Sequence, residues 1–329
     1  MVSSRAVYRA DLRSLLPDDP TLALALASVF GELTECERIA HIFASTFPAE
    51  IVRCTFADGR SVELLCKCSA GKQSDSGGHR GGVAYEAMVY RSLLTPLGCS
   101  TPRYYGEWTD RHRSEHFLFI EYLGAAVRTD DAADPAAALC AAARWAADFH
   151  TRAARVPALA SGPKLTEYTV DYYRYWASRA REFGAPRRAE FPWLAGLCDA
   201  FEEIAASFAA PDAVIHGEFT PHNVLVEDGV VRPIDWESAA WGLGEIDIAG
   251  LTEGWPDDAT AACVAEYRRI RWPDGAPPDA ADRLDFARVY WALRWLGNSP
   301  RWREKKLVPR MTQLRASGER LGLISEPAS

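Results

Sequence analysis

The residues best suited to chemistry lie close together between positions 216 and 235 of the 329-residue chain. His216 and Gly217 precede Glu218, Asn223 follows Glu218 by five positions, and Asp235 follows Asn223 by twelve. Magnesium binds carboxylate and amide oxygens, takes few of them from the protein, and completes its shell with water and substrate phosphates. A carboxylate that the metal does not use can orient an attacking hydroxyl and accept its proton, as phosphoryl transfer requires. The spacing therefore predicts that Asn223 and Asp235 hold magnesium and that Glu218 is the catalytic carboxylate.

Lys67 and Glu86 supply two further groups that such a site needs. Few of the 37 basic residues are lysines, and Lys67 is one of them, inside the strand-like segment 62–68. Phosphoryl-transfer sites use a lysine that contacts the phosphates and is held by a helix glutamate, and Glu86 lies in the helix-like segment that follows. Two simpler interpretations stay open, because a strand lysine can extend its amine into solvent and Glu86 can be a solvent-facing helix residue.

The first 124 residues predict a small, β-rich lobe that would position Lys67 and Glu86. It begins with an N-terminal helical extension over residues 1–35, in which a short apolar helix ends at Gly31. Asp58 and Gly59 supply a tight turn between two strands. The predicted strands cover 38–44, 50–57, 61–68, 103–108 and 116–123, and the predicted helix covers 83–94. Five strands with one helix packed on them indicate an antiparallel lobe.

Residues 125–329 predict a mainly helical lobe that would position the other three groups. Helical periodicity covers 134–153, 166–184, 190–208, 257–271, 280–297 and 308–322. The exception is 213–235, where the pattern predicts a strand, a loop and a two-stranded hairpin that turns at Asp228-Gly229. The fold expected is therefore α+β and bilobal, with a cleft between the lobes.

Composition narrows the class of protein. The chain is 48% hydrophobic and 25% charged, as globular proteins are, and no apolar run reaches the length of a membrane span. Its start lacks the apolar core of a secretory signal, so we expect a cytoplasmic protein. The net charge of -8 disfavours a nucleic-acid partner. Eight cysteines without a CxxC pair disfavour a zinc site and a disulfide scaffold.

The motifs together resemble those of a known family. The stretch HGEFTPHNVLVEDGVVRPIDWE is similar to the signature of the aminoglycoside phosphotransferase and choline kinase-like superfamily, which has the protein-kinase-like fold and also includes homoserine kinases. Lys67, Glu86 and the segment FLFIEYLG at 117–124 precede it in the expected order, so the resemblance covers about 36–325.

The resemblance implies a role for each matching position. It implies that Lys67 contacts the α- and β-phosphates of ATP or GTP and pairs with Glu86, and that Glu218 occupies the catalytic-base position. The backbone from Glu121 to Leu123 would meet the nucleotide base at the hinge. Asn223 and Asp235 would bind Mg²⁺, and Asp247 would be structural.

Two departures from the family pattern matter. The family usually has aspartate at the position of Glu218, which is one methylene longer. The phosphate loop, Ala44 to Pro48, contains no glycine, unlike the glycine-rich loop of protein kinases. In this loop Ser45, Thr46 and Phe47 are the candidate phosphate contacts, the first two through hydroxyl and backbone N–H groups.

Three functions follow from these residues. The first is a magnesium-dependent phosphotransferase that moves the γ-phosphate of a nucleoside triphosphate to a hydroxyl of a small molecule, aminoglycoside-like or another natural-product alcohol. The second is a Ser/Thr kinase acting on a peptide precursor, as in lanthipeptide or thioamide-type biosynthesis, for which the basic segment 301–306 could bind an acidic leader. The third is a nucleotide-binding pseudokinase, which the two departures would favour.

Overall fold

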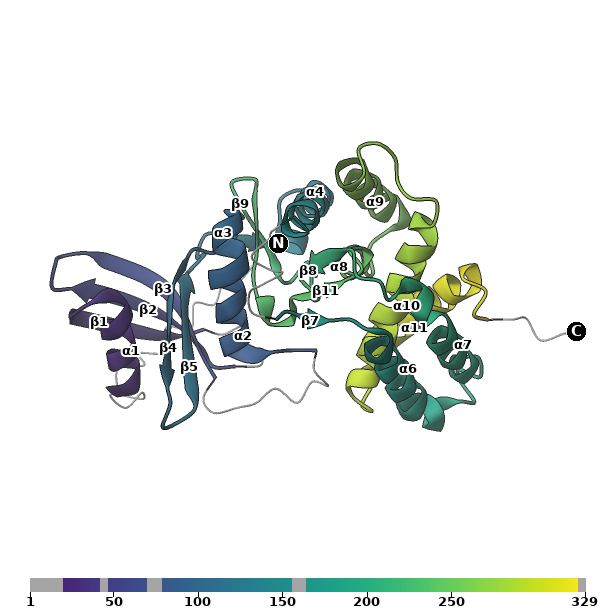
Figure 1. Cartoon of the computed structure of the whole chain (residues 1–329), viewed down its shortest axis with the longest axis horizontal. Helices are drawn as coiled ribbons and strands as arrows, with labels where there is room; N and C mark the ends of the chain where they lie inside the picture. The colour runs from purple at the N-terminus through teal and green to yellow at the C-terminus, as the bar shows by residue number, and fades with distance from the viewer. Residues whose placement is uncertain (1–19, 42–46, 70–78, 156–163, 325–329) are drawn as a thin grey trace, which may run out of the picture. The chain divides into compact units, whose positions relative to one another are not determined.

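The chain divides into two compact units. Figure 1 shows the computed structural model, which describes residues 20–41, 47–69, 79–155 and 164–324. The first unit comprises the chain up to Arg91 together with Pro102–Gly124, and the second comprises Ser92–Thr101 and the chain from Ala125 onward. The segment Ser92–Thr101, which a division at residue 124 assigns to the first lobe, thus lies in the second unit.

The first unit is an antiparallel sheet with helices. Its strands are β1 (Leu33–Ala40), β2 (Ala49–Phe56), β3 (Ser61–Cys68), β4 (Tyr104–Asp110) and β5 (Glu115–Glu121). Its helices are α1 (Pro20–Phe30) and α2 (Gly82–Val89), and α2 is followed by a π-helical turn at Tyr90–Leu94 and the short α3 (Thr95–Leu97). The strand order is β1-β2-β3-β5-β4 and every pairing is antiparallel. The five-stranded antiparallel sheet predicted from the sequence is confirmed.

Strand β3 is the central strand of this sheet, and its side chains alternate between the two faces of the sheet. Leu64 and Cys66 point into a buried core that also contains Val52 and Phe119. Successive side chains of a strand point to opposite faces, so Lys67 lies on the face away from that core. A central strand is held by a neighbour on each side, and Lys67 is opposite Leu118 of β5 in the register.

Strand β1 begins at Leu33, five residues before the predicted start at Arg38. It forms the edge of the sheet, and most of its side chains are exposed. An edge strand exposed in this way lacks the alternation of apolar and polar residues on which sequence-based prediction depends.

The second unit is mainly helical, as predicted. Its helices are α4 (Pro135–Ala153), α6 (Val170–Gly184), α7 (Leu194–Phe208), α8 (Glu245–Leu251), α9 (Asp257–Arg271), α10 (Ala280–Asn298) and α11 (Glu304–Arg320). Its short strands are β6 (Val127–Arg128), β7 (Thr166–Glu167), β8 (Ala213–Ile215), β9 (Val224–Glu227), β10 (Val230–Pro233) and β11 (Ala240–Gly242). Single 3₁₀ turns lie at Thr129–Asp131, Ala185–Arg187 and Trp236–Ser238. Among the described helices, none is long and apolar enough to cross a membrane.

Two small sheets position the predicted site segment. One has the order β10-β9-β6, and the other has the order β7-β11-β8. The β9–β10 hairpin turns at Asp228 and Gly229, which both have positive φ (49° and 79°), as a type I′ turn requires. The strand, loop and hairpin predicted over 213–235 are therefore confirmed.

The second unit differs from the sequence prediction at two short elements, β7 and α8. The helix predicted over 166–184 starts only at Val170, because Thr166 and Glu167 pair with β11. Helix α8 was not predicted, since all seven of its residues are buried and it has no polar face to give a helical period.

Candidate active site

Lys67 and Glu86 form a close ion pair in the first unit. The Nζ atom of Lys67 donates hydrogen bonds to both carboxylate oxygens of Glu86, each at 2.8 Å. The side chain of Glu86 is 2% exposed and that of Lys67 is 15% exposed. The pairing follows from the elements, because Lys67 points out of the central strand and Glu86 lies on α2. Both simpler interpretations are thus wrong: this lysine is not extended into solvent, and this glutamate does not face it.

Of the phosphate-loop candidates of the first unit, Phe47 lies within the described residues. Phe47 is half-buried, and its ring lies against Gly82, the first residue of α2. Ser45 and Thr46 lie outside the described residues.

Glu121 and Leu123 lie where β5 ends. Glu121 is the last residue of the strand, and its carboxylate accepts the backbone N–H of Arg103 at 3.1 Å. Its own N–H donates to the Arg103 carbonyl at 2.8 Å. Leu123 is half-buried and lies beyond the last ladder pair. These bonds fix the backbone at the predicted hinge.

In the second unit, Gly217 allows the predicted catalytic loop to turn directly after β8. Its φ is +80°, and a Cβ atom at this position would lie 2.2 Å from the Ser238 carbonyl oxygen. A side chain is excluded here by both the backbone conformation and the space. Glycine in the His-Gly-Glu sequence is therefore a steric requirement. The next residue, Glu218, is buried, with 7% of the whole residue exposed.

His216 connects the two halves of the predicted site. Its Nε2 donates to the Ile234 carbonyl at 2.8 Å, and its Nδ1 accepts the Glu218 N–H at 3.3 Å. Burial lowers the pKa of the His216 imidazole, against the opposing effect of Asp247. A neutral ring with one donor and one acceptor nitrogen satisfies both bonds. His216 thus joins the Glu218 backbone to the residue before Asp235.

Asn223 and Asp235 are brought next to this loop by the hairpin. The Nδ2 of Asn223 donates to the Glu218 carbonyl at 3.1 Å, and the Ile234 N–H donates to the Asn223 carbonyl at 2.9 Å. Because the amide nitrogen binds the loop, the amide oxygen is the atom that can ligate a metal. Asp235 has a left-handed backbone (φ 68°, ψ 59°), which is uncommon for a residue other than glycine. Backbone strain of this kind is concentrated at functional sites.

This donor set fits magnesium. One carboxylate and one amide oxygen are few ligands, and Mg²⁺ usually takes few from the protein. In the part of the chain that the structure describes, there is no group of three or more His, Cys, Asp and Glu side chains that could hold a metal ion.

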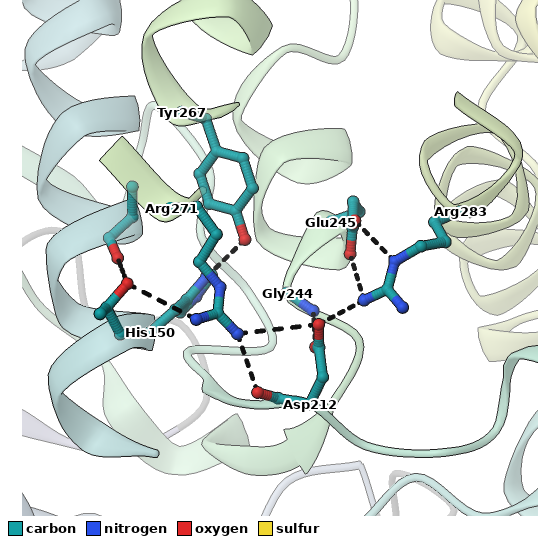
Figure 2. A network of polar contacts seen from close by, with 9 residues as sticks. His150, Asp212, Gly244, Glu245, Tyr267, Arg271 and Arg283 are labelled. Atoms are coloured by element: carbon teal, nitrogen blue, oxygen red, sulfur yellow. Dashed lines mark hydrogen bonds and ion pairs between the residues drawn. The ribbon is translucent and has the colours of Figure 1, made fainter. Parts of the chain in front are cut away.

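Asp247 binds the backbone at the start of the loop. Its two carboxylate oxygens accept the backbone N–H groups of His216 at 2.7 Å and Gly217 at 2.9 Å. One of them also contacts His150 Nε2 at 3.0 Å, and His150 Nδ1 contacts the Tyr267 hydroxyl at 3.0 Å. Figure 2 shows His150 of α4 and Tyr267 of α9 pointing toward each other. The structural role implied for Asp247 agrees with these contacts.

Arg294 is the site residue that sequence reasoning missed. Its Nη1 donates to Glu218 Oε1 at 3.0 Å, and both side chains are nearly buried, at 12% and 9% exposure. The only signal was its position in α10 between Trp291 and Trp295. Nothing in that pattern indicates which residue the arginine faces.

Comparisons with known proteins identify the family. Residues 76–300 match the phosphotransferase enzyme family. The structure is similar to that of a microcompartment-associated aminopropanol kinase, with 16% identity and a TM-score of 0.62 over 91% of this chain and 95% of the other. It is also similar to an aminoglycoside-3'-phosphotransferase of type VIII (21% identity, TM-score 0.50, 80% and 93% covered). A third similar structure is the choline kinase LicA from Streptococcus pneumoniae (12% identity, TM-score 0.52, 90% and 96% covered). A search of curated proteins finds no match.

The family match spans well over half of the chain. The protein therefore belongs to the phosphotransferase enzyme family, and its α+β fold is protein-kinase-like. The resemblance recognised from the motifs is confirmed, as is the prediction of a phosphotransferase.

Proposed function

We propose that the protein transfers the γ-phosphate of ATP or GTP to a hydroxyl of a small molecule, with magnesium as cofactor, in the cytoplasm. One observation supports the proposal most directly: His216 and Asn223 tie the backbone of Glu218 to the hairpin end that presents Asp235. In this proposal, the catalytic carboxylate and the two metal ligands are held by one set of hydrogen bonds. Preorganisation of this kind is how phosphoryl-transfer sites act, since positioning and electrostatics supply most of the rate.

Each residue has a defined task in this proposal. Asn223 and Asp235 would hold Mg²⁺, which when bound neutralises charge on the phosphates. Lys67, oriented by Glu86, binds the α- and β-phosphates. Glu218 orients the acceptor hydroxyl and accepts its proton as the oxygen–phosphorus bond forms.

The acceptor is assigned as a small-molecule alcohol. The similar structures are named for aminopropanol, aminoglycoside and choline substrates, and all three are small hydroxyl compounds. Their identity to this chain is too low to name the compound. A Ser/Thr peptide acceptor and a pseudokinase without any acceptor are the alternatives that the experiment must separate.

Asp235→Asn is the sharpest test of the proposed function. Asparagine tolerates the left-handed backbone of Asp235 and removes only the charge that would bind the metal. We expect phosphate transfer to fall by a factor of about 100 or more while thermal unfolding stays cooperative. Asp228→Asn is the matched control, because Asp228 also has a positive φ and lies in the same hairpin. It should retain the rate of the natural protein.

The assay measures radioactive phosphate transferred from ATP or GTP to a panel of aminoglycosides and amino alcohols, and separately to Ser/Thr peptides. Transfer to the first group supports the proposal. Transfer to peptides alone would replace the small molecule by a peptide acceptor. Nucleotide binding without transfer or hydrolysis would make the protein a pseudokinase, and a fully active Asp235→Asn variant would disprove the metal assignment.

A further inference from the structure

Arg294 holds the carboxylate of Glu218 from the side of α10. The Nη1–Oε1 distance is 3.0 Å, and little water reaches either side chain. A charge-assisted hydrogen bond is stronger than a neutral one, and it is stronger again where water is excluded. The contact therefore restricts where the carboxylate can lie.

The guanidinium of Arg294 is itself fixed by aromatic side chains. Its Cζ lies 4.5 Å from the centroid of the Trp291 ring, which is a cation–π contact one helical turn away. Burial acts to lower the pKa of the Arg294 guanidinium, but the Glu218 carboxylate acts against it, and the pKa is raised. Arg294 is thus a permanent positive charge in a fixed place.

A glutamate at the catalytic position needs such a restraint. Its side chain has one more rotatable bond than aspartate, and ordering that bond costs conformational entropy. We propose that Arg294 is a positioning residue, which restrains the longer Glu218 side chain so that one carboxylate oxygen faces Arg294 and the other is presented to the acceptor hydroxyl. This inference depends on the proposed function, because it gives Glu218 the catalytic task.

The proposal separates kcat from KM in a specific way. Arg294 contacts the carboxylate that orients the acceptor hydroxyl, whereas Lys67 and Glu86 are the residues proposed to serve the nucleotide phosphates. Loss of the Arg294–Glu218 contact should therefore lower kcat and leave the KM for ATP nearly unchanged.

The experiment compares Arg294→Met and Arg294→Lys with the natural protein. For Arg294→Met we expect kcat to fall by about 10- to 100-fold. The KM for ATP should change less than kcat. Arg294→Lys keeps the charge without the planar guanidinium, so it should restore only part of kcat.

Arg310→Met is the matched control. Arg310 also pairs with a carboxylate, Glu253, at 2.6 Å, and its Cζ also lies over an indole, that of Trp295, at 4.0 Å. Its loss should lower the melting temperature about as much as the loss of Arg294, without lowering kcat.

The outcomes separate the two proposals. An active natural protein whose Arg294→Met variant keeps the same kcat would overturn the role of Arg294 and leave the proposed function standing. Equal falls of kcat in Arg294→Met and Arg310→Met would reduce Arg294 to a structural residue. A natural protein without phosphate transfer would overturn both proposals. If Arg294→Met does not fold, Arg294→Lys still decides. Lysine lacks the guanidinium geometry that places Nη1 against Glu218 Oε1, so an unchanged kcat in that variant would contradict the positioning role.

Discussion

Glu218 is one methylene longer than the aspartate usual in the family, and the structure contains groups that fit the extra length. Its backbone is fixed by His216 and Asn223, and its carboxylate meets Arg294. The departure from the family pattern therefore does not by itself indicate an inactive protein. A carboxylate that is held at both ends suits the task of orienting a hydroxyl.

At the same scale, His216 predicts how stability depends on pH. Its pKa in the folded protein is below the ordinary 6.5, so the stability it contributes is present above about pH 6.5 and is lost as the pH falls below that value. We expect the free energy of unfolding in urea to fall between about pH 7.5 and pH 5.5. His216→Gln should be less stable at the higher pH and should show a weaker decline.

Other titrating groups also contribute to such a decline, so His112→Gln serves as the control. His112 is exposed, and its replacement should leave both the stability and its pH dependence unchanged. An equally steep decline in His216→Gln would show that His216 is not the group responsible.

At the scale of elements, a partly buried polar network surrounds the strand that leads into the predicted catalytic loop. Asp212, which precedes β8, forms an ion pair with Arg283 of α10. The Nε of Arg283 also donates to Oε1 of Glu245, at the start of α8, at 2.9 Å. Arg271 of α9 donates to the Asp212 backbone carbonyl at 2.9 Å. Figure 2 shows these groups converging near Gly244. The network ties three helices to the strand from which the loop begins.

A second set of contacts supports the same loop: Asp247 contacts His150, which contacts Tyr267. We expect substitutions to have a smaller effect the further they lie from the loop. Tyr267→Phe removes one hydrogen bond and should lower the free energy of unfolding by about 1 kcal/mol. Asp247→Asn replaces an acceptor oxygen by an NH₂ group opposite backbone N–H donors, which should cost about 3 kcal/mol and also reduce kcat. Chemical denaturation and the phosphate-transfer assay measure both effects.

The exposed Asp258 provides the control for that comparison, since Asp258→Asn should change neither quantity. A Tyr267→Phe loss as large as that of Asp247→Asn would contradict the assignment of Asp247 as the direct support of the loop.

The elements also show what the sequence can predict. The sequence could propose five site residues because phosphoryl-transfer chemistry fixes their residue types and their order along the chain: Lys67, Glu86, Glu218, Asn223 and Asp235. Arg294 could not be found, because its proposed role depends on which face of α10 packs against Glu218, and the sequence does not show this. Helix α8 escaped prediction because it is buried on all sides, and β1 started earlier than predicted because its exposed residues alternate weakly.

At the scale of the whole molecule, the net charge of -8 does not identify the acceptor. Several carboxylates of the second unit are paired internally: Glu218 with Arg294, Glu245 with Arg283 and Glu253 with Arg310. Acidic residues that are already neutralised are not available to attract a cationic substrate. The acceptor must therefore be found by assay and not from the charge of the chain.

The last prediction concerns the stability of the whole chain when it binds nucleotide. A ligand that binds only the native state stabilises it by about 2.7 kcal/mol at a concentration of 100 Kd. We therefore expect MgATP to raise the melting temperature by several degrees and the same ATP with excess EDTA to raise it less. Asp235→Asn should lose the advantage of magnesium, whereas Glu218→Gln should keep it while losing phosphate transfer. A Glu218→Gln variant that still transfers phosphate at the natural rate would remove Glu218 from the chemistry, and equal shifts with and without EDTA would remove the metal.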